Sequence, residues 1–158
     1  MSRVPPVRPS LRAWLPVVLW MALLFGASTD LGAPRQTSRF LVPLLRWLVP
    51  DISPVALDRV QFAVRKTGHA LAYALLAALI WRAKRRATNH PTPDFRRDAA
   101  FAFALAVLYA ASDEWHQTFT ASRHGSVADV ALDAAGAAAG LALLWLWGRR
   151  RQPAPAMS

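Results

Sequence analysis

The chain of 158 residues is long enough for one domain, and 54% of its residues are hydrophobic. It has no cysteine, which excludes disulfide bonds, thiolate metal sites and cysteine nucleophiles. Lys and Arg outnumber Asp and Glu by 19 to 9, but the basic residues gather at the ends of apolar runs, as in "WRAKRRATNH" and "WGRRRQ". Because membrane proteins distribute basic residues in this way, we expect a lipid bilayer as partner and no nucleic acid.

Four apolar stretches alternate with polar segments along the chain: residues 14–28, 67–81, 99–112 and 127–147. A bilayer core requires about 20 helical residues, and the fourth stretch alone reaches that length without polar neighbours. The other three must draw polar side chains into or near the membrane. The sequence therefore predicts an all-α integral membrane bundle of about four transmembrane helices.

The basic residues also predict the domain organisation and the orientation. Twelve of the 19 Lys and Arg residues lie before the first stretch, between the second and third, or in the tail. Cytoplasmic segments carry such an excess, so both termini are expected in the cytoplasm. We expect residues 1–12 to be a cytoplasmic segment, 13–147 to form the membrane domain and 148–158 to be a disordered cytoplasmic tail.

The first apolar stretch admits a second interpretation, as a cleaved signal peptide, since "FGAST" loosely resembles a cleavage site. We favour retention, because the segment before this stretch is long and Pro16 interrupts the apolar residues early. Removal would leave three spans with the same assignment of loops.

The first outer connection contains helical signals of its own. Its apolar residues recur with helical period: Phe40, Leu41, Leu44, Leu45 and Leu48. This predicts a short amphipathic helix that lies on the outer leaflet or packs over the bundle. Ser53 and Pro54 then form a helix start signal, and that helix can continue into the second span with Gly68 as a bend.

Polar residues concentrate at the outer ends of the last three stretches. The candidates are Arg65, Lys66, His69, Asp113, Glu114, His116, Gln117, Arg123, Asp129 and Asp133. Since consecutive spans cross the membrane in opposite directions, these residues should converge at one face, with acidic residues of one helix opposite basic residues of another. The helix dipole favours this pairing, because Asp113 and Glu114 oppose the negative end of their own helix. Arg65 and Lys66 would be equally misplaced at the start of theirs.

The fourth stretch carries a stripe of small and acidic residues. Asp129, Asp133, Gly136 and Gly140 stand at positions i, i+4, i+7 and i+11, which share one helix face. Gly136 and Gly140 form a small-xxx-small pattern that lets another helix approach closely, within one chain or in a homo-oligomer. Presenting Asp133 to lipid would be costly, so we expect this face to point inward.

Two segments, "RKTGHALAYALLA" and "DEWHQTFTASRHGSVADVALDAAGAAAG", resemble the VanZ-like family of small bacterial membrane proteins, named for a member linked to teicoplanin resistance. The matching positions are Lys66, His69, Glu114, Gln117, Arg123, Asp129, Gly136 and Gly140. Asp133 departs from the pattern, which often has asparagine there. The resemblance implies a multi-pass protein of the bacterial cytoplasmic (inner) membrane with a role in the cell envelope or in antibiotic resistance. It implies no reaction.

Several of these residues have simpler interpretations. Asp129 follows Ser126 at the capping-box spacing and could serve only to start a helix. Asp133 could form a structural salt bridge to Arg65, Lys66 or Arg123. His69 could be a core histidine bonded to one carboxylate.

Specific chemistries have weaker support. His69, Glu114, His116 and Asp129 lack the spacing of a known metal motif, so we expect no metal and no cofactor. No nucleophile elbow surrounds Ser112 or Ser126. Proton or ion passage is disfavoured as well, because the inner halves of the four stretches have no acidic or histidine residue.

The sequence leaves two functions open. In the first, the ten outer polar residues bind a charged envelope component, such as an anionic lipid, a lipid-linked cell-wall precursor or a glycopeptide, with arginine as a bidentate partner. In the second, the protein is a membrane-embedded enzyme acting on an envelope lipid or precursor, with His69 or Glu114 as general base. The sequence assigns no catalytic residue.

Overall fold

The computed structural model describes residues 11–29, 34–87, 94–119 and 125–150. These residues form five helices: α1 (Leu11–Ser28), α2 (Pro34–Leu48), α3 (Pro54–Ala87), α4 (Phe95–Gln117) and α5 (Val127–Arg150). The described ranges contain no strand, so the predicted all-α fold is confirmed.

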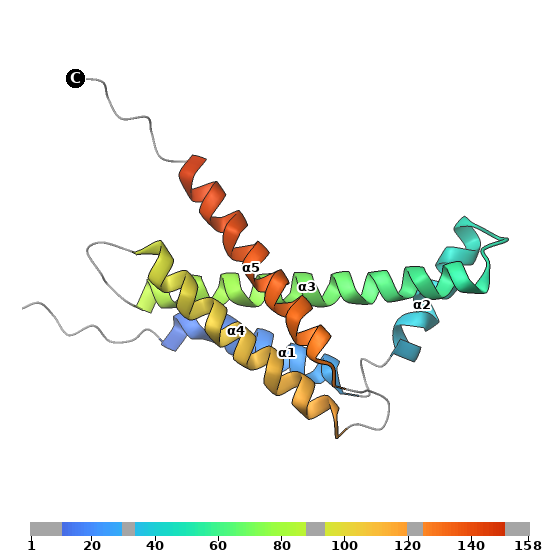
Figure 1. Ribbon diagram of the computed structural model, residues 1–158, viewed down its shortest axis with the longest axis horizontal. Coiled ribbons are helices and arrows are strands. Elements are labelled where there is room, and N and C mark those ends of the chain that lie inside the picture. The colour runs from blue at the N-terminus through green and yellow to red at the C-terminus, as the bar shows by residue number, and fades with distance from the viewer. Residues whose placement is uncertain (1–10, 30–33, 88–93, 120–124, 151–158) are drawn as a thin grey trace, which may run out of the picture.

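The long helix α3 is the centre of the arrangement and contacts each of the other four helices. Figure 1 shows α1, α4 and α5 beside its C-terminal half, and α2 beside its N-terminal end. Along the chain, α1, α3, α4 and α5 alternate in direction, so that α3 and α5 run parallel to each other (Figure 1). The outer ends of the predicted spans therefore lie together.

Many of the buried residues are small, although Tyr73, Leu76 and Ile80 are buried as well, and many large apolar side chains point outward. Ala102, Ala106 and Ala110 form one buried stripe on α4, and Ala77 and Ala137 are buried on α3 and α5. The exposed side chains include Leu15, Leu19 and Leu23 on α1, Leu71 and Leu75 on α3, Leu108 on α4 and Leu143 on α5. A water-soluble bundle buries such side chains. The observed distribution is the one that a lipid environment permits, because lipid solvates the large apolar residues while small residues let helices approach.

Two of the five helices, α1 and α5, are long and apolar enough to cross a membrane by length and composition alone. Only 11% and 22% of their most apolar windows are buried, unlike the core helix of a soluble protein. Helices α3 and α4 do not meet this criterion, because charged residues flank their apolar stretches closely. The structure thus supports two of the four predicted spans by this measure.

Helix α3 starts where the sequence signal placed it, and Ala56 N–H donates to Ser53 Oγ at 3.2 Å. Its 34 residues span roughly 50 Å without interruption at Gly68, where a bend was predicted. Arg65 and Lys66 therefore lie in the helix interior. The dipole argument for these two residues required a helix that begins near them, and it does not apply because the positive end of α3 is three turns away.

The predicted amphipathic helix is α2, which contacts α3 and no other described helix. It therefore does not pack over the bundle. Its Phe40, Leu44 and Trp47 side chains are exposed.

At the opposite end of the bundle, Asp94 caps α4 by accepting from Arg96 N at 2.9 Å and Arg97 N at 3.4 Å. Helix α5 continues to Arg150, past the predicted domain end at 147. The remainder of the predicted tail, residues 151–158, and most of the predicted N-terminal segment, residues 1–10, lie outside the described residues.

Candidate functional site

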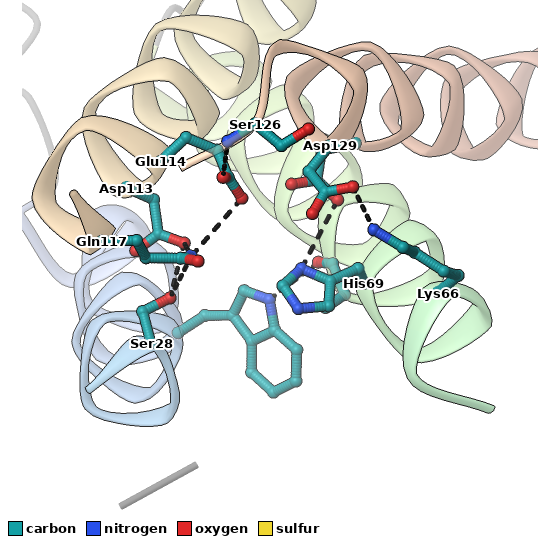
Figure 2. Close-up of polar contacts among 11 residues, drawn as sticks. Ser28, Lys66, His69, Asp113, Glu114, Gln117, Ser126 and Asp129 are labelled. Atoms are coloured by element: carbon teal, nitrogen blue, oxygen red, sulfur yellow. Dashed lines mark hydrogen bonds and ion pairs between the residues drawn. The ribbon is translucent and has the colours of Figure 1, made fainter. Parts of the chain in front are cut away.

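Helices α1 and α4 end, and α5 begins, beside the same part of α3 (Figure 1). The polar residues at these ends form one group, which we call the polar cluster: Ser28, Lys66, His69, Asp113, Glu114, Gln117, Ser126, Asp129 and Asp133. Figure 2 shows two sets of contacts side by side: one joins Ser28, Asp113, Gln117 and Glu114 to the backbone N–H of Ser126, and the other contains Lys66, Asp129 and His69. Segments 85 residues apart in the chain thus meet through side chains.

The outer part of the cluster is an ion pair between Lys66 Nζ on α3 and Asp129 Oδ1 on α5 (Figure 2). The two side chains are 24% and 26% exposed. The Lys66 ammonium also lies 5.3 Å from the centroid of the Phe62 ring, close enough for a cation–π contact. This pair therefore remains reachable from outside the bundle.

One turn further along α5, Asp133 is buried, with 1% of its surface exposed. His69 Nδ1 lies 3.7 Å from its Oδ1, a charge interaction if the imidazole is protonated. Neither carboxylate oxygen has a hydrogen-bond donor within the described part of the protein. The predicted inward orientation of this face is what the structure shows, but the partner is His69 instead of Arg65 or Lys66.

On the other side of the cluster, Asp113 is held by neutral donors. Ser28 Oγ donates to Asp113 Oδ2 at 2.5 Å, and Gln117 Nε2 donates to the same oxygen at 3.2 Å and to Ser28 Oγ at 3.3 Å. All three side chains are buried. This network ties the end of α1 to the end of α4. Sequence reasoning missed Ser28, whose one signal was its position at the end of the first apolar stretch.

Glu114 connects α4 to the start of α5. Its Oε2 accepts from the backbone N–H of Ser126 at 2.8 Å, and its Oε1 accepts from Gln117 Nε2 at 3.4 Å. Among the described residues, the hydrogen bonds of Asp113 and Glu114 come from neutral donors instead of basic side chains, while the basic candidate Arg123 lies outside these residues. The Glu114 carboxylate accepts from the Ser126 N–H, which lies at the positive end of α5, and this contact favours a negative charge on Glu114.

Glycine permits this connection. A Cβ at Gly125 would overlap the backbone carbonyl oxygen of Glu114 and stand 2.8 Å from Thr118 Cγ2. The chain can approach α4 this closely only without a side chain at residue 125.

The small-residue stripe brings α5 against α3. A Cβ at Gly140 would stand 2.6 Å from the carbonyl oxygen of Ala74, and one at Gly136 would overlap the carbonyl of Ala70. The backbones therefore touch at two successive turns. In this register Asp133 faces His69 and Asp129 faces Lys66.

Two predicted site residues in the described ranges, Arg65 and His116, make other contacts. The Arg65 guanidinium is exposed and lies 5.7 Å from the centroid of the Phe62 ring. The His116 ring packs against Phe25 of α1 with a centroid distance of 4.6 Å. Arg123 lies outside the described residues.

The sequence pattern that defines the VanZ/LLP1 family matches residues 13–148, nearly the whole chain. The chain belongs to the VanZ/LLP1 family. The resemblance inferred from the two polar segments is therefore confirmed. Comparisons with curated proteins and with solved structures gave no match.

In this VanZ/LLP1 chain the chemistry of the cluster differs between its outer and inner parts. The outer part has a cation and an anion that neutralise each other and remain partly exposed. The inner part contains three buried carboxyl groups, from Asp113, Glu114 and Asp133. No group of three or more His, Asp or Glu side chains within the described ranges is arranged to hold a metal ion. The arrangement suits recognition of a charged group.

Proposed function

We propose that this VanZ/LLP1 protein crosses the bacterial cytoplasmic (inner) membrane four times and binds a charged component of the cell envelope at its polar cluster. Both termini lie in the cytoplasm, and the cluster faces outward. The candidate ligands are a charged lipid, a lipid-linked cell-wall precursor and a glycopeptide. Binding alters the sensitivity of the cell to glycopeptides such as teicoplanin.

The exposed apolar surface supports four spans instead of two. Helix α3 exposes Leu71 and Leu75, and α4 exposes Phe101, Phe103 and Leu108, beside the apolar surfaces of α1 and α5. Contiguous apolar surface of this extent marks contact with lipid or with another protein. Because α3 and α4 pack between the two helices that meet the length criterion, all four share one membrane.

The distribution of exposed basic side chains supports the orientation. Most of them lie at the end of the bundle opposite the polar cluster: Arg12 on α1, Arg82, Arg85 and Arg86 on α3, Arg96 and Arg97 on α4, and Arg149 and Arg150 on α5. The other exposed basic residues of the described ranges, Arg39, Arg46, Arg59 and Arg65, lie on α2 and the N-terminal half of α3. Excess Lys and Arg is typical of the cytoplasmic side. The polar cluster then lies on the outer side, next to the envelope.

The observation that carries the binding proposal is the accessible ion pair of Lys66 and Asp129 above buried ionisable groups. Ionisable residues within a membrane bundle are expensive and usually functional. A simple structural tie between α3 and α5 would not require them, since the glycine contacts already hold these two helices together. A ligand that carries both charges can replace this ion pair, with its anionic group at Lys66 and its cationic group at Asp129.

Single substitutions in the native host test this proposal. Lys66→Gln and Asp129→Asn remove one charge each and keep the approximate shape, while Arg59→Gln removes an exposed charge elsewhere on α3. We expect the first two variants to change teicoplanin susceptibility and to weaken binding of a labelled lipid-linked precursor by purified protein, and the third to do neither. Unchanged behaviour in stable, inserted Lys66 and Asp129 variants would reject the proposal. Mass spectrometry of the incubated lipids separates binding from catalysis, because turnover yields a new mass.

A further inference from the structure

Beneath the ion pair, several buried oxygen atoms have no hydrogen-bond partner among the described residues. These atoms are Asp113 Oδ1, Asp133 Oδ1, Asp133 Oδ2 and the Tyr73 hydroxyl oxygen. Each of the three side chains is at least 97% buried. Leaving polar atoms without partners in such a position is costly, so a group that bonds to them would be favoured.

All four oxygen atoms can accept hydrogen bonds, and the carboxylate oxygens can only accept. Asp133 is attracted to the neighbouring His69 and is repelled by Asp129 and Asp113. Tyr73 lies within electrostatic reach of Asp113 and Asp133, so the unpartnered atoms belong to one region of the bundle. A phosphate or carboxylate entering here would be repelled by the carboxyl groups, and the Tyr73 hydroxyl is the one donor among the three side chains. The group that fits is a cation with several N–H donors.

A primary ammonium has that chemistry. It carries one positive charge and three N–H donors and has no acceptor, whereas a quaternary ammonium has the charge but no donor. An ammonium in this region would supply donors to the unpartnered oxygens of Asp133, Asp113 and Tyr73. Lys66, which is 24% exposed and lies one turn before His69 on α3, would then meet an anionic group on the same molecule.

The position of the cluster favours an amphiphile. The cluster lies where α1, α4 and α5 end or begin, and each of these helices exposes apolar side chains along its length. Trp115 and Phe119 at the end of α4 are strongly exposed. Aromatic side chains in such positions sit at headgroup depth.

We infer that the polar cluster binds the primary ammonium of a zwitterionic amphiphile, with the ammonium at Asp133 and Asp113 and the adjoining phosphate at Lys66. This inference rests on the proposed function and names the chemical class of its ligand. The ammonium is recognised by its donors, and the phosphate by the cation at the rim.

Binding of defined lipids to the full-length protein tests the inference. The protein in detergent is titrated with phosphatidylethanolamine, with phosphatidylcholine, which has no N–H donor, and with phosphatidylglycerol, which has no cation. We expect phosphatidylethanolamine to bind about tenfold more tightly than either, the effect of one charged hydrogen bond. Asp133→Asn should remove that preference. Asp98→Asn, which neutralises a buried carboxyl group at the opposite end of α4, should keep it.

The outcomes separate this inference from the proposed function. Preference for phosphatidylglycerol that depends on Lys66 and survives Asp133→Asn would overturn the inference and leave binding of a charged component intact. Equal binding of all three lipids, together with unchanged teicoplanin susceptibility of the Lys66→Gln strain, would overturn both. If Asp133→Asn does not fold, Tyr73→Phe removes one acceptor with little change in shape, and it should reduce the preference for phosphatidylethanolamine. A preference that Tyr73→Phe leaves unchanged would count against the inference.

The source of the ammonium is distinguished by competition. Soluble O-phosphoethanolamine that displaces phosphatidylethanolamine from the wild-type protein at similar concentrations would support an ammonium ligand dissolved in the periplasm. Failure to compete, with the lipid preference retained, supports a membrane lipid.

Discussion

Gly136 of α5 lies directly against the backbone carbonyl of Ala70 on α3, with no room for a Cβ between them. One turn earlier on the same face, Asp133 lies opposite His69. The contact of two backbones thus determines how close the buried carboxylate comes to the imidazole. Packing deep in the bundle and the geometry of the polar cluster depend on the same pair of helices.

We expect Gly136→Ala to lower the stability of the protein by about 1–3 kcal/mol, because the methyl group forces α3 and α5 apart. The measurement is thermal unfolding in detergent. Gly68→Ala is the matched control on α3, since nothing lies within 4 Å of a Cβ at that position. The control should lose no stability, because alanine favours helix over glycine. Equal melting temperatures for Gly136→Ala and wild type would contradict the backbone contact.

Glu114→Ala should loosen the start of α5. The substitution removes the oxygen that accepts from Ser126 N–H, and a buried donor left without its partner costs about 1–3 kcal/mol. Hydrogen exchange at residues 126–129 should accelerate, while exchange in the middle of α5 should not. Glu114→Gln, which keeps an acceptor oxygen, should show a smaller effect. Asp58→Ala, at an exposed acidic residue of α3, is the control and should leave exchange at these residues unchanged. Protection at Ser126 that survives Glu114→Ala would show that another group accepts this bond.

The ion pair of Lys66 and Asp129 should contribute little to stability. Ion pairs in contact with solvent contribute about 0.2–1 kcal/mol, so a double-mutant cycle with Lys66→Gln and Asp129→Asn should give a small coupling in unfolding. The same cycle, measured on ligand binding, should give a larger coupling if the ligand exchanges partners with the pair. A stability coupling of several kcal/mol and none in binding would assign the pair a structural role.

The sequence predicted the helices and the end at which polar residues meet, because apolar stretches and alternating crossings determine both. It did not predict which groups form hydrogen bonds or ion pairs with each polar residue. Glu114 bonds to a backbone N–H, which no side-chain pattern reveals, and Ser28 is one serine among several. Adjacent residues on a helix point about 100° apart, so Lys66 reaches Asp129 while Arg65 does not.

The sequence predicted four membrane spans, and two helices of the structure, α1 and α5, are long and apolar enough to be spans by length and composition. The continuous α3 carries its apolar stretch in its second half, and nothing in the sequence marks where a helix of roughly 50 Å would enter a bilayer. Gly68 was a reasonable place for a bend, yet the helix passes through it. The backbone hydrogen bonds of a helix are satisfied on both sides of the membrane surface, so no break is required.

The four-span topology can be tested directly because the natural chain has no cysteine and needs no background substitutions. Single cysteines at Trp115 and Val127, both exposed beside the polar cluster, should react with an impermeant maleimide added to intact spheroplasts. A cysteine at Arg86 should react only after the membrane is opened, since it belongs to the basic end. Cysteines at Leu75 and Leu143, which are exposed in the middle of α3 and α5, should react in neither case if lipid covers them. Labelling of Leu75 in intact cells would show that α3 does not cross the bilayer, whereas labelling of Val127 only after lysis would reverse the orientation and remove the polar cluster from the envelope side.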